Sequence, residues 1–367
     1  MNIYALLGAM TEKNASDLHI RAGAPPVFRI NGALFRARME PLTPDHLNQF
    51  VQELLSEDQK KFFENNHEMD FALGVRGVGR FRFNVFHQRG TPSFAIRSIK
   101  TNVPKFDDLN MPSVILDLCL RRRGLILVTG TTGSGKTTLL SSMIDHINRS
   151  QSVNIVTIED PIEYLHRDKK SVIAQREIGT DAGDFATALR GCFRQDPDVI
   201  LIGEIRDKDT METALSASDT GHLVMSTLHT INAVETISRI ITFFPPHQHE
   251  QVRLILSSVL VAVVSLRLVP RTDGQGRVPA AEIMINTASV SEYIREPDKA
   301  HLILEAISDG KSQYGSQTFD QSLYDLYQSG MIAFEVAKQN ANNPENFELR
   351  VKGISGASDR WQGMIDE

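Results

Sequence analysis

The spacing of apolar and polar residues changes character near residue 100. Before this point, strand-like runs are mixed with segments in which apolar residues recur at helical intervals. The strand-like runs cover 17–21, 27–30, 33–35, 69–75, 79–87 and 92–99, and the helical segments cover 3–10, 44–55 and 57–65. Short strands and helices mixed in this way predict a small α+β domain over residues 1–99.

After residue 112, apolar runs of strand length alternate with segments of helical periodicity. Strands are expected over 125–129, 154–158, 199–202 and 222–228. Such alternation predicts a mostly parallel sheet with helices on both faces, which is an α/β fold. Beyond residue 243 the pattern favours helices over 247–267, 298–309, 318–329 and 332–340, with one strand at 278–285. The stretch 100–112 holds two prolines and is expected to be a linker, so the second domain covers 113–367.

Composition narrows the class of protein. The 367 residues suffice for two domains, and 41% hydrophobic with 23% charged residues are typical of globular proteins. A net charge of −6 argues against a general nucleic-acid binder, because phosphate contacts need a basic surface. The two cysteines, Cys119 and Cys192, can form neither a disulfide framework nor a four-cysteine zinc site, which favours a reducing compartment. No signal peptide or transmembrane segment is expected, since the longest apolar run, 254–266, is too short and is predicted to be a buried helix.

A glycine-rich stretch between an apolar strand and a helical segment carries the strongest chemical signal. It runs Gly130-Thr131-Thr132-Gly133-Ser134-Gly135-Lys136-Thr137, with Thr138 as the next phosphate-binding candidate. This is the P-loop pattern, in which backbone N–H groups and a helix N-terminus hold phosphate oxygens. Lys136 is expected to reach the β- and γ-phosphates of ATP, and the Thr137 hydroxyl to bind Mg²⁺. A Gly/Ser/Thr loop that ends in Lys-Thr by chance is the alternative, which the flanking strand and helix disfavour.

ATP hydrolysis also needs carboxylates near the phosphates. The apolar strand 199–202 ends at Gly203-Glu204, which is the Walker B pattern with Glu in the usual Asp position. Glu204 is therefore expected to hold the Mg²⁺ shell through water. The alternative is a buried strand that ends at an acidic residue by chance.

A second group of carboxylates follows the strand after the P-loop helix. Glu159, Asp160 and Glu163 lie around Pro161, at the strand end where ligands bind in such sheets. Glu163 is the candidate general base or water-orienting residue, with Glu159 as the alternative. Asp160 can also cap a helix, a structural role that is compatible with either assignment.

Two histidines bracket the strand-like run near 222–228. His229 lies at the C-terminal end of this strand, where it could sense the γ-phosphate, whereas His222 is expected to be structural or to lie at a subunit contact. Neither histidine has Cys or His partners at metal-ligand spacing, so a zinc site is not expected.

Arginines alternate with phenylalanines in residues 79–84, which predicts one cationic strand face and one core face. Arg82 lies in this strand, Arg97 lies in the next one, and both fall outside the predicted nucleotide domain. They could reach ATP across a domain or subunit boundary, as arginine fingers do, or they could form a solvated basic face.

These stretches, in this order, resemble the secretion ATPase superfamily, the hexameric motors of type II and type IV secretion and of type IV pili. Residues 130–137 resemble its Walker A motif, 157–163 its Asp box, 196–207 its Walker B region and 221–230 its His box. Arg82 and Arg97 match the arginine positions of this superfamily. The resemblance implies a RecA-like P-loop domain with C-terminal helices and a smaller, PAS-like N-terminal α+β domain.

Within the superfamily, the chain resembles the retraction ATPases of type IV pili. Assembly motors usually carry an extra N-terminal domain and a four-cysteine zinc motif, and this sequence shows neither. The retraction signature AIRNLIRE aligns with 289–296, where the last three residues are retained, and 318–323 looks closer to the PilU-like branch than to the PilT-like one.

The resemblance implies a homohexameric ATPase that uses ATP and Mg²⁺ to disassemble pilin and so retract the pilus. It implies a cytoplasmic motor, peripheral at the inner membrane, that works with a platform protein and with or without a paralogous retraction ATPase. The alternatives are a pilus assembly or secretion ATPase, a nucleic-acid translocase and a non-hydrolysing scaffold. Acidic balance and 7% aromatic residues argue against the translocase, and the presence of Lys136, Glu163 and Glu204 argues against the scaffold.

Overall fold

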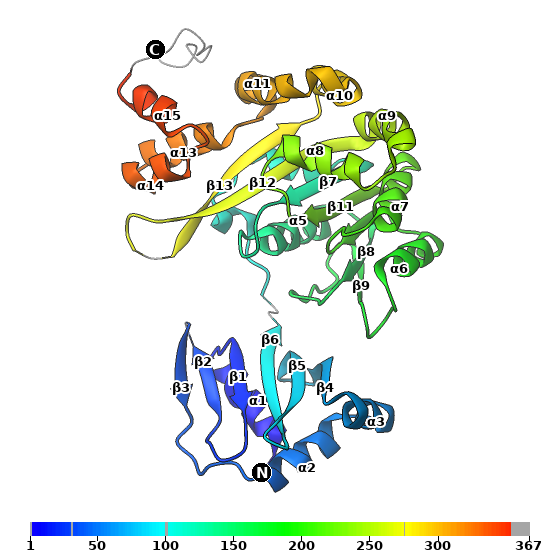
Figure 1. Ribbon diagram of the computed structural model, residues 1–367, viewed down its shortest axis with the longest axis vertical. Coiled ribbons are helices and arrows are strands. Elements are labelled where there is room, and N and C mark those ends of the chain that lie inside the picture. The colour runs from blue at the N-terminus through cyan, green and yellow to red at the C-terminus, as the bar shows by residue number, and fades with distance from the viewer. Residues whose placement is uncertain (1, 31, 100–101, 275, 354–367) are drawn as a thin grey trace. The chain divides into compact units, whose positions relative to one another are not determined.

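The computed structural model describes residues 2–30, 32–99, 102–274 and 276–353 (Figure 1). The chain divides into two compact units. The first comprises Met1–Asn102 with Ile162–Leu165, and the second comprises Val103–Pro161 and His166–Glu367. Two residues at the start of the predicted linker, Lys100 and Thr101, lie outside the described residues.

The N-terminal unit is an antiparallel sheet with three helices, an α+β arrangement. Its strands are β1 (Asp17–Ile20), β2 (Val27–Ile30), β3 (Ala33–Arg36), β4 (Glu68–Val75), β5 (Gly79–Gln88) and β6 (Thr91–Ile99), in the order β3-β2-β1-β6-β5-β4. Its helices are α1 (Ile3–Glu12), α2 (Pro44–Leu54) and α3 (Glu57–Asn66). Capping boxes led by Thr43 and Ser56 start α2 and α3, because each hydroxyl accepts a hydrogen bond from an otherwise unpaired backbone N–H.

The alternation in β5 sorts its side chains as the sequence pattern predicts. Phe81, Phe83 and Val85 are fully buried in the core of the N-terminal unit. Arg82 lies between the two phenylalanines and is partly exposed. Its cross-strand neighbour on β6 is Arg97. The two arginines therefore share one face of the sheet, opposite the core.

The second unit is built on a seven-stranded sheet in the order β13-β12-β7-β11-β10-β8-β9. The strands are β7 (Gly124–Thr129), β8 (Asn154–Glu159), β9 (Val172–Glu177), β10 (Val199–Ile202), β11 (Leu223–Leu228), β12 (Leu260–Pro270) and β13 (Arg277–Ile285). Every neighbouring pair is parallel except β12 with β13. The mostly parallel sheet predicted by the alternating pattern is confirmed, and the C-terminal ends of β7, β8, β10 and β11 lie at one edge.

Helices cover both faces of this sheet, because successive strand residues point to opposite sides. Leu125 and Leu127 of β7 pack in the cluster that includes α6 to α11, and Ile126 and Val128 pack in the cluster of α4 and α5. The helices beside the sheet are α4 (Val114–Cys119), α5 (Lys136–Ser150), α6 (Phe185–Cys192), α7 (Lys208–Asp219), α8 (Ala233–Thr242) and α9 (His249–Val259). The C-terminal helices are α10 (Ala288–Arg295), α11 (Ile303–Asp309), α12 (Lys311–Tyr314), α13 (Phe319–Gln328), α14 (Phe334–Asn340) and α15 (Pro344–Val351).

The prediction of one helix over 247–267 is wrong in its second half. Helix α9 ends at Val259 and the chain continues as β12, which pairs with β7 on one side and β13 on the other. A strand buried on both faces has no polar side, so its apolar run lacks a period and resembles a buried helix. The β-branched residues Val261, Val263 and Val264 favour the strand.

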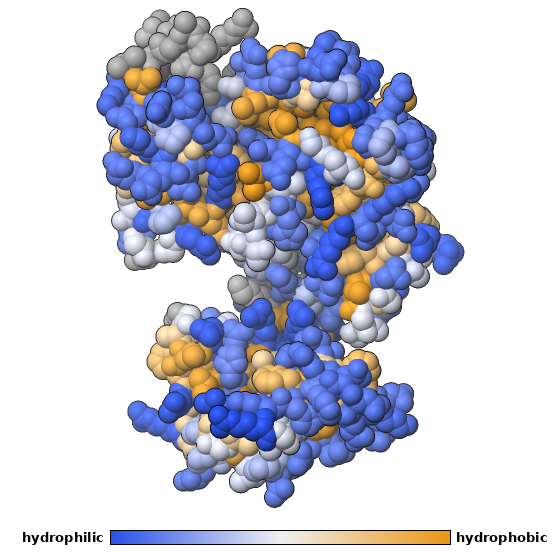
Figure 2. Space-filling model, in the orientation of Figure 1, coloured by the Kyte–Doolittle hydropathy of each residue, from blue (hydrophilic) through white to orange (hydrophobic). Residues whose placement is uncertain are grey.

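The surface is largely polar. Figure 2 shows hydrophilic residues over most of the visible face, with hydrophobic residues over β2 and β3 and between α8 and α10. On β3, Leu34 and Phe35 are exposed, so this edge strand leaves apolar side chains at the surface. Both cysteines are buried, and each packs in the core as a small hydrophobic residue. Within the described parts of the chain, no helix combines the length and apolar character needed to cross a membrane.

Candidate nucleotide site

The glycine-rich loop joins the end of β7 to the start of α5, as a P-loop requires. Gly130 has a φ of 139°, and a Cβ added there would lie 2.5 Å from the Ser134 Oγ and 2.6 Å from the Leu266 carbonyl oxygen. A side chain at this position would therefore force the loop off the sheet. The Ser134 hydroxyl is buried and has no hydrogen-bond partner among the described residues, so the loop retains an unpaired polar atom.

The ammonium group of Lys136 is held at this loop. Its Nζ donates to the carbonyl oxygen of Gly130 at 2.8 Å and to that of Thr131 at 3.1 Å. Lys136 is also the first residue of α5, where unpaired backbone N–H groups and the helix dipole favour an anion. Thr131, Thr132 and Gly133 are exposed, and Thr137 and Thr138 are partly exposed. These features make the loop a cationic, N–H-rich cradle open to solvent.

The strand order brings candidate site residues of two more segments to the same edge of the sheet. Strand β11 lies between β7 and β10, and Thr129 at the end of β7 faces Leu228 at the end of β11. The residues that follow β10 and β11 include Glu204 and His229. The Nε2 atom of His229 lies 3.1 Å from the Oε2 atom of Glu204. The structure therefore brings Lys136, Glu204 and His229 together.

Arg206 is a member of this group to which the sequence analysis assigned no role. Its guanidinium forms an ion pair with Glu204. Burial lowers the pKa of His229, and the positive charges of Lys136 and Arg206 lower it further. His229 is therefore neutral at pH 7, and its Nε2–H donates to the Glu204 carboxylate. Sequence position alone, two residues after Glu204, was the available signal for Arg206.

Two carboxylates of the acidic segment after β8 have different surroundings. Glu159 is buried, and its Oε1 accepts hydrogen bonds from the Thr157 hydroxyl at 2.6 Å and from the Gln175 amide at 3.1 Å. Glu163 is exposed and makes no hydrogen bond or ion pair with the residues that the structure describes. The carboxylate of Glu159 is thus held by hydrogen bonds to neighbouring side chains, whereas the carboxylate of Glu163 is exposed to solvent.

Arg82 and Arg97 belong to the N-terminal unit, where each faces an aspartate. Arg82 lies 3.8 Å from Asp70, and the Arg97 Nε donates to Asp17 at 2.9 Å. Burial raises the pKa of Asp17, but the hydrogen bonds from Arg97 and Ser16 outweigh it and leave the pKa below its usual value. Both arginine side chains keep substantial exposure, 39% and 71%, so their charges remain accessible.

His222 has a structural position. Its Nδ1 lies 2.9 Å from the Ala217 carbonyl oxygen and 3.3 Å from the Thr220 hydroxyl, and its ring packs against Phe193. Across the described ranges, no cluster of three or more His, Cys, Asp or Glu side chains could hold a metal ion by itself.

Comparisons with known proteins define the class. The model of the family "Type II/IV secretion system protein" matches residues 2–322, so the chain belongs to this family. The chain is 40% identical to the type IV pilus ATPase PilU of Pseudomonas aeruginosa over 96% of this chain and 92% of the relative. It is 42% identical to the type IV pilus retraction ATPase PilT of the same organism, over 95% of this chain and 100% of the relative.

A solved structure agrees with these relatives. The crystal structure of the pilus retraction motor PilT with bound ADP superposes with a TM-score of 0.87 at 46% identity and covers 95% of this chain and 99% of that one. This likeness extends to both units of the chain, which has the fold of a RecA-like P-loop ATPase. The chain is therefore an ATPase of the type IV pilus retraction class.

Proposed function

We propose that this chain is a motor that hydrolyses ATP to retract type IV pili by releasing pilin from the pilus base. The observation that carries the proposal is the convergence of Lys136, Glu204 and His229 at the P-loop of a chain related over its length to PilU and PilT. This convergence supplies the parts that phosphoryl transfer requires: a phosphate cradle, a carboxylate and a group that can sense the γ-phosphate.

The P-loop supplies the phosphate site. Backbone N–H groups of residues 130–135 surround the β-phosphate, and Lys136 exchanges its loop carbonyl partners for β- and γ-phosphate oxygens. The buried Ser134 hydroxyl, which has no partner among the described residues, fits a site completed by a bound anion. The PilT structure holds ADP, and by this proposal the present chain binds its nucleotide at the P-loop.

The donors beside the loop fit Mg²⁺. Thr137 offers a hydroxyl and Glu204 a carboxylate, and Mg²⁺ prefers oxygen ligands, keeps several waters and shares phosphate oxygens with the protein. When bound, the ion would neutralise charge on the β- and γ-phosphates. Glu204 itself is held in place by Arg206 and by the Nε2–H of His229, which fixes the orientation of its carboxylate.

Glu163 is the proposed general base or water-orienting residue. A carboxylate that orients attacking water must be free to accept its proton or hydrogen bond, and Glu163 is exposed. Glu159 is the alternative. Its Oε1 already accepts two hydrogen bonds, which support a structural role.

Arg82 and Arg97 are proposed to act on nucleotide bound by a neighbouring subunit of a homohexamer. Their positive charges lie on the N-terminal unit, and a P-loop site gains rate when an arginine enters from outside to stabilise the transferring phosphoryl group. Entry and release of these arginines during each cycle would convert hydrolysis into movement of the N-terminal units. By this proposal the ring works in the cytoplasm, against a platform protein of the inner membrane.

Three measurements test the proposed function. The purified chain should release phosphate from ATP in a Mg²⁺-dependent manner, and light scattering should find a ring-sized particle with and without DNA. Cells that lack the chain should carry labelled pili that extend but retract rarely, and the wild-type gene should restore retraction. Stimulation of hydrolysis by DNA, with normal retraction in the deletion strain, would instead favour a nucleic-acid translocase.

A further inference from the structure

The carboxyl group of Glu282 is buried inside the second unit, and the chemistry proposed above does not use it. Glu282 lies on β13 and is 1% exposed. Its Oε1 atom accepts a hydrogen bond from the backbone N–H of Ala233 at 2.8 Å. Ala233 is the first residue of α8, where backbone N–H groups have no partner within the helix. Glu282 therefore joins β13, at the edge of the sheet, to the start of α8.

Glu282 also lies in a row of paired residues that leads to the nucleotide site. Across β13, β12, β7 and β11, the row consists of Glu282, Ser265, Thr129 and Leu228. The Thr129 hydroxyl donates to the Ser265 hydroxyl at 2.8 Å, and both residues are fully buried. Thr129 is the last residue before the P-loop, and Leu228 is the last residue before His229. The P-loop and His229 thus both follow directly from this row.

The segment 229–232 links the row to α8. Its first residue, His229, follows β11 directly, and its last, Asn232, caps α8 by accepting from a backbone N–H of the first turn at 2.8 Å. Between them, Thr230 is buried, and its hydroxyl lies 2.6 Å from that of Thr236. The Thr236 hydroxyl donates to the Asn232 carbonyl oxygen at 2.7 Å. The segment is therefore held by β11 at one end and by the first turn of α8 at the other.

The geometry points to Glu282 as a positioning residue for His229. This inference rests on the proposed role of His229 at the nucleotide site. Glu282 holds the first turn of α8 against β13, and this turn holds residues 230–232. His229 in turn donates to the Glu204 carboxylate. Loss of the acceptor at position 282 should loosen the α8 end of the segment, and small displacements of a positioned group reduce catalysis.

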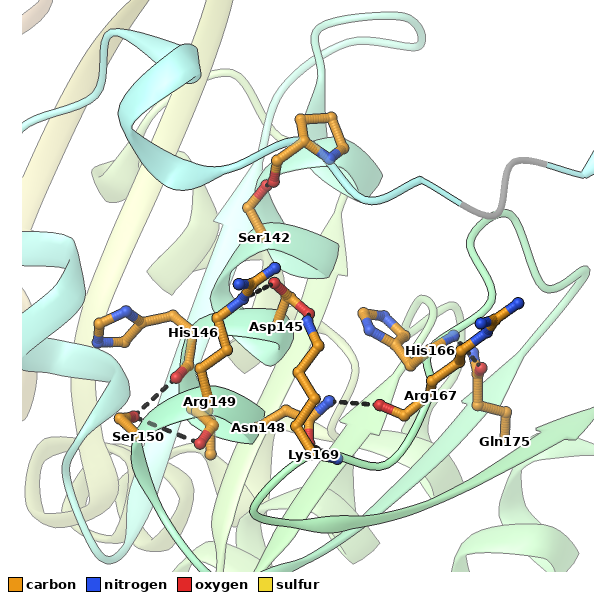
Figure 3. Close-up of polar contacts among 12 residues, drawn as sticks. Ser142, Asp145, His146, Asn148, Arg149, Ser150, His166, Arg167, Lys169 and Gln175 are labelled. Atoms are coloured by element: carbon orange, nitrogen blue, oxygen red, sulfur yellow. Dashed lines mark hydrogen bonds and ion pairs between the residues drawn. The ribbon is translucent and has the colours of Figure 1, made fainter.

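The helix that follows the P-loop is anchored by other contacts. Figure 3 shows Asp145 and Asn148 of α5 on the side that faces Arg167 and Lys169. The Asn148 Nδ2 donates to the Arg167 carbonyl oxygen at 2.8 Å, and the Lys169 ammonium contacts the Asp145 carboxylate. These contacts involve neither β13 nor α8. A change at Glu282 should therefore affect turnover more than nucleotide affinity.

Two substitutions at Glu282 separate the hydrogen bond from the packing of the side chain. Glu282→Met removes the acceptor, keeps a similar length and should lower kcat roughly three- to tenfold, with KM for ATP within about twofold of wild type. Glu282→Gln should keep the wild-type kcat at pH 7, because its amide oxygen can accept from the Ala233 N–H. Burial raises the pKa of Glu282 to about 7, and the neutral and the ionised acid both offer this acceptor.

Hydrogen–deuterium exchange locates the effect. Exchange in 229–236 should rise in Glu282→Met and stay at the wild-type rate in Glu282→Gln, and exchange in 130–138 should stay unchanged in both. Ser322→Ala is the matched control. The Ser322 Oγ on α13 accepts from the backbone N–H of Ala281 on β13 at 3.0 Å, so this change also removes a side-chain acceptor from a backbone N–H. The control should leave kcat and exchange in 229–236 near the wild-type values.

A double variant distinguishes positioning from general destabilisation. In the His229→Asn background, Glu282→Met should cause no further loss of kcat, because both changes act on the same contact with Glu204. A further loss would indicate general destabilisation and overturn the inference. If Glu282→Met does not fold, Thr236→Val is the second variant. It removes the hydroxyl contacts of the first turn of α8 with little change of shape, and it should lower kcat and raise exchange in 229–236.

The outcomes separate this inference from the proposed function. Wild-type turnover in His229→Asn would overturn the role of His229 and, with it, this inference. If His229→Asn lowers turnover while folded Glu282→Met, or folded Thr236→Val in its place, keeps the wild-type kcat, the positioning inference is overturned and the proposed function stands. An equal loss of kcat in Glu282→Gln and Glu282→Met would also overturn it. So would a rise in KM with faster exchange in 130–138, since that result indicates a loosened P-loop.

Discussion

His229 Nε2 lies 3.1 Å from Glu204 Oε2, at the ends of adjacent parallel strands. Burial, with the charges of Lys136 and Arg206, lowers the pKa of His229, so a neutral imidazole donates this bond at pH 7. The carboxylate at the Walker B position therefore has a fixed orientation that depends on the segment after β11. A movement of His229 would be transmitted directly to Glu204.

The Lys136 ammonium should carry much of the nucleotide affinity. Replacement by alanine removes the charge-assisted hydrogen bonds to the phosphates, which are worth roughly 1.5–3 kcal/mol, or about 10- to 100-fold in Kd. Lys136→Ala should therefore bind a fluorescent ATP analogue at least about tenfold more weakly in equilibrium titration. Lys60→Ala, which removes a surface lysine paired with Glu57 in the other unit, is the control and should bind normally. Unchanged affinity in Lys136→Ala would contradict the P-loop assignment.

The Glu204 carboxylate should matter for turnover more than for binding. Glu204→Gln keeps the shape of the side chain but loses the negative charge that attracts Arg206 and the Mg²⁺ shell, so phosphate release should fall roughly 100-fold or more. Nucleotide affinity, measured by titration in the same buffer, should stay within a few-fold of wild type. His229→Asn, which loses the fixed orientation but keeps the carboxylate, should show a smaller loss. Full activity in Glu204→Gln would remove Glu204 from the site.

The arginines of β5 and β6 should act between subunits. Arg82→Ala or Arg97→Ala should lower turnover at least roughly tenfold with little change in nucleotide affinity, because an arginine finger acts on the transition state. When either variant is titrated into wild type under conditions of ring exchange, activity should fall more steeply than by dilution. A strictly linear decline would argue for action within one subunit. Wild-type rates for both variants would indicate that these arginines only form a solvated basic face.

Glu282 on β13 should make stability depend on pH. Its Oε1 accepts from the Ala233 N–H at 2.8 Å and its Oε2 is buried without a partner among the described residues. Burial raises its pKa to about 7, from an ordinary value of 4.5. The folded state thus retains a proton that the unfolded state releases, and the stabilising contribution is full below pH 4.5 and is lost as pH rises through 7.

Glu282→Gln tests this dependence because glutamine resembles the neutral acid. The free energy of unfolding of the variant should exceed that of wild type by up to about 3 kcal/mol at pH 8, at about 1.4 kcal/mol per unit of pKa shift, and by little at pH 5. Urea titrations at the two pH values measure the difference. Glu292→Gln, at a partly exposed side chain of α10, is the control and should show no such gain at pH 8. An equal effect of Glu282→Gln at both pH values would contradict the raised pKa.

The P-loop, β7, β8, β10 and β11 could be predicted from sequence because each signal is local. Apolar runs of strand length end at glycine, proline or acidic residues, and glycine spacing marks the phosphate loop. The strand that replaces the second half of the predicted helix 247–267 could not be predicted, because a strand buried on both faces shows no periodicity. The pairing of β12 with β7 and β13 decides this, and those partners are distant in sequence.

In the candidate site, too, some features have a local sequence signal and others depend on tertiary contacts. Lys136, Glu163, Glu204 and His229 could be proposed from motifs, but the hydrogen bond of His229 to Glu204 depends on the strand order β7-β11-β10. The ion pair of Arg206 with Glu204 and the hydrogen bonds of Asn148 depend on contacts that no local pattern encodes. Asn148, on an amphipathic helix, has the spacing of an ordinary core position, and its four hydrogen bonds to 167–171 become evident from the tertiary structure.

By the proposed mechanism, this chain hydrolyses ATP with Glu163 activating water. The most direct measurement is steady-state phosphate release by Glu163→Gln and Glu159→Gln beside wild type, with nucleotide binding measured on the same samples. Glu163→Gln should lower kcat roughly 100-fold or more and bind ATP normally, whereas Glu159→Gln should retain the larger share of activity. Turnover of Glu163→Gln within a few-fold of wild type, with a severe loss in Glu159→Gln, would contradict the claim and move the base to Glu159.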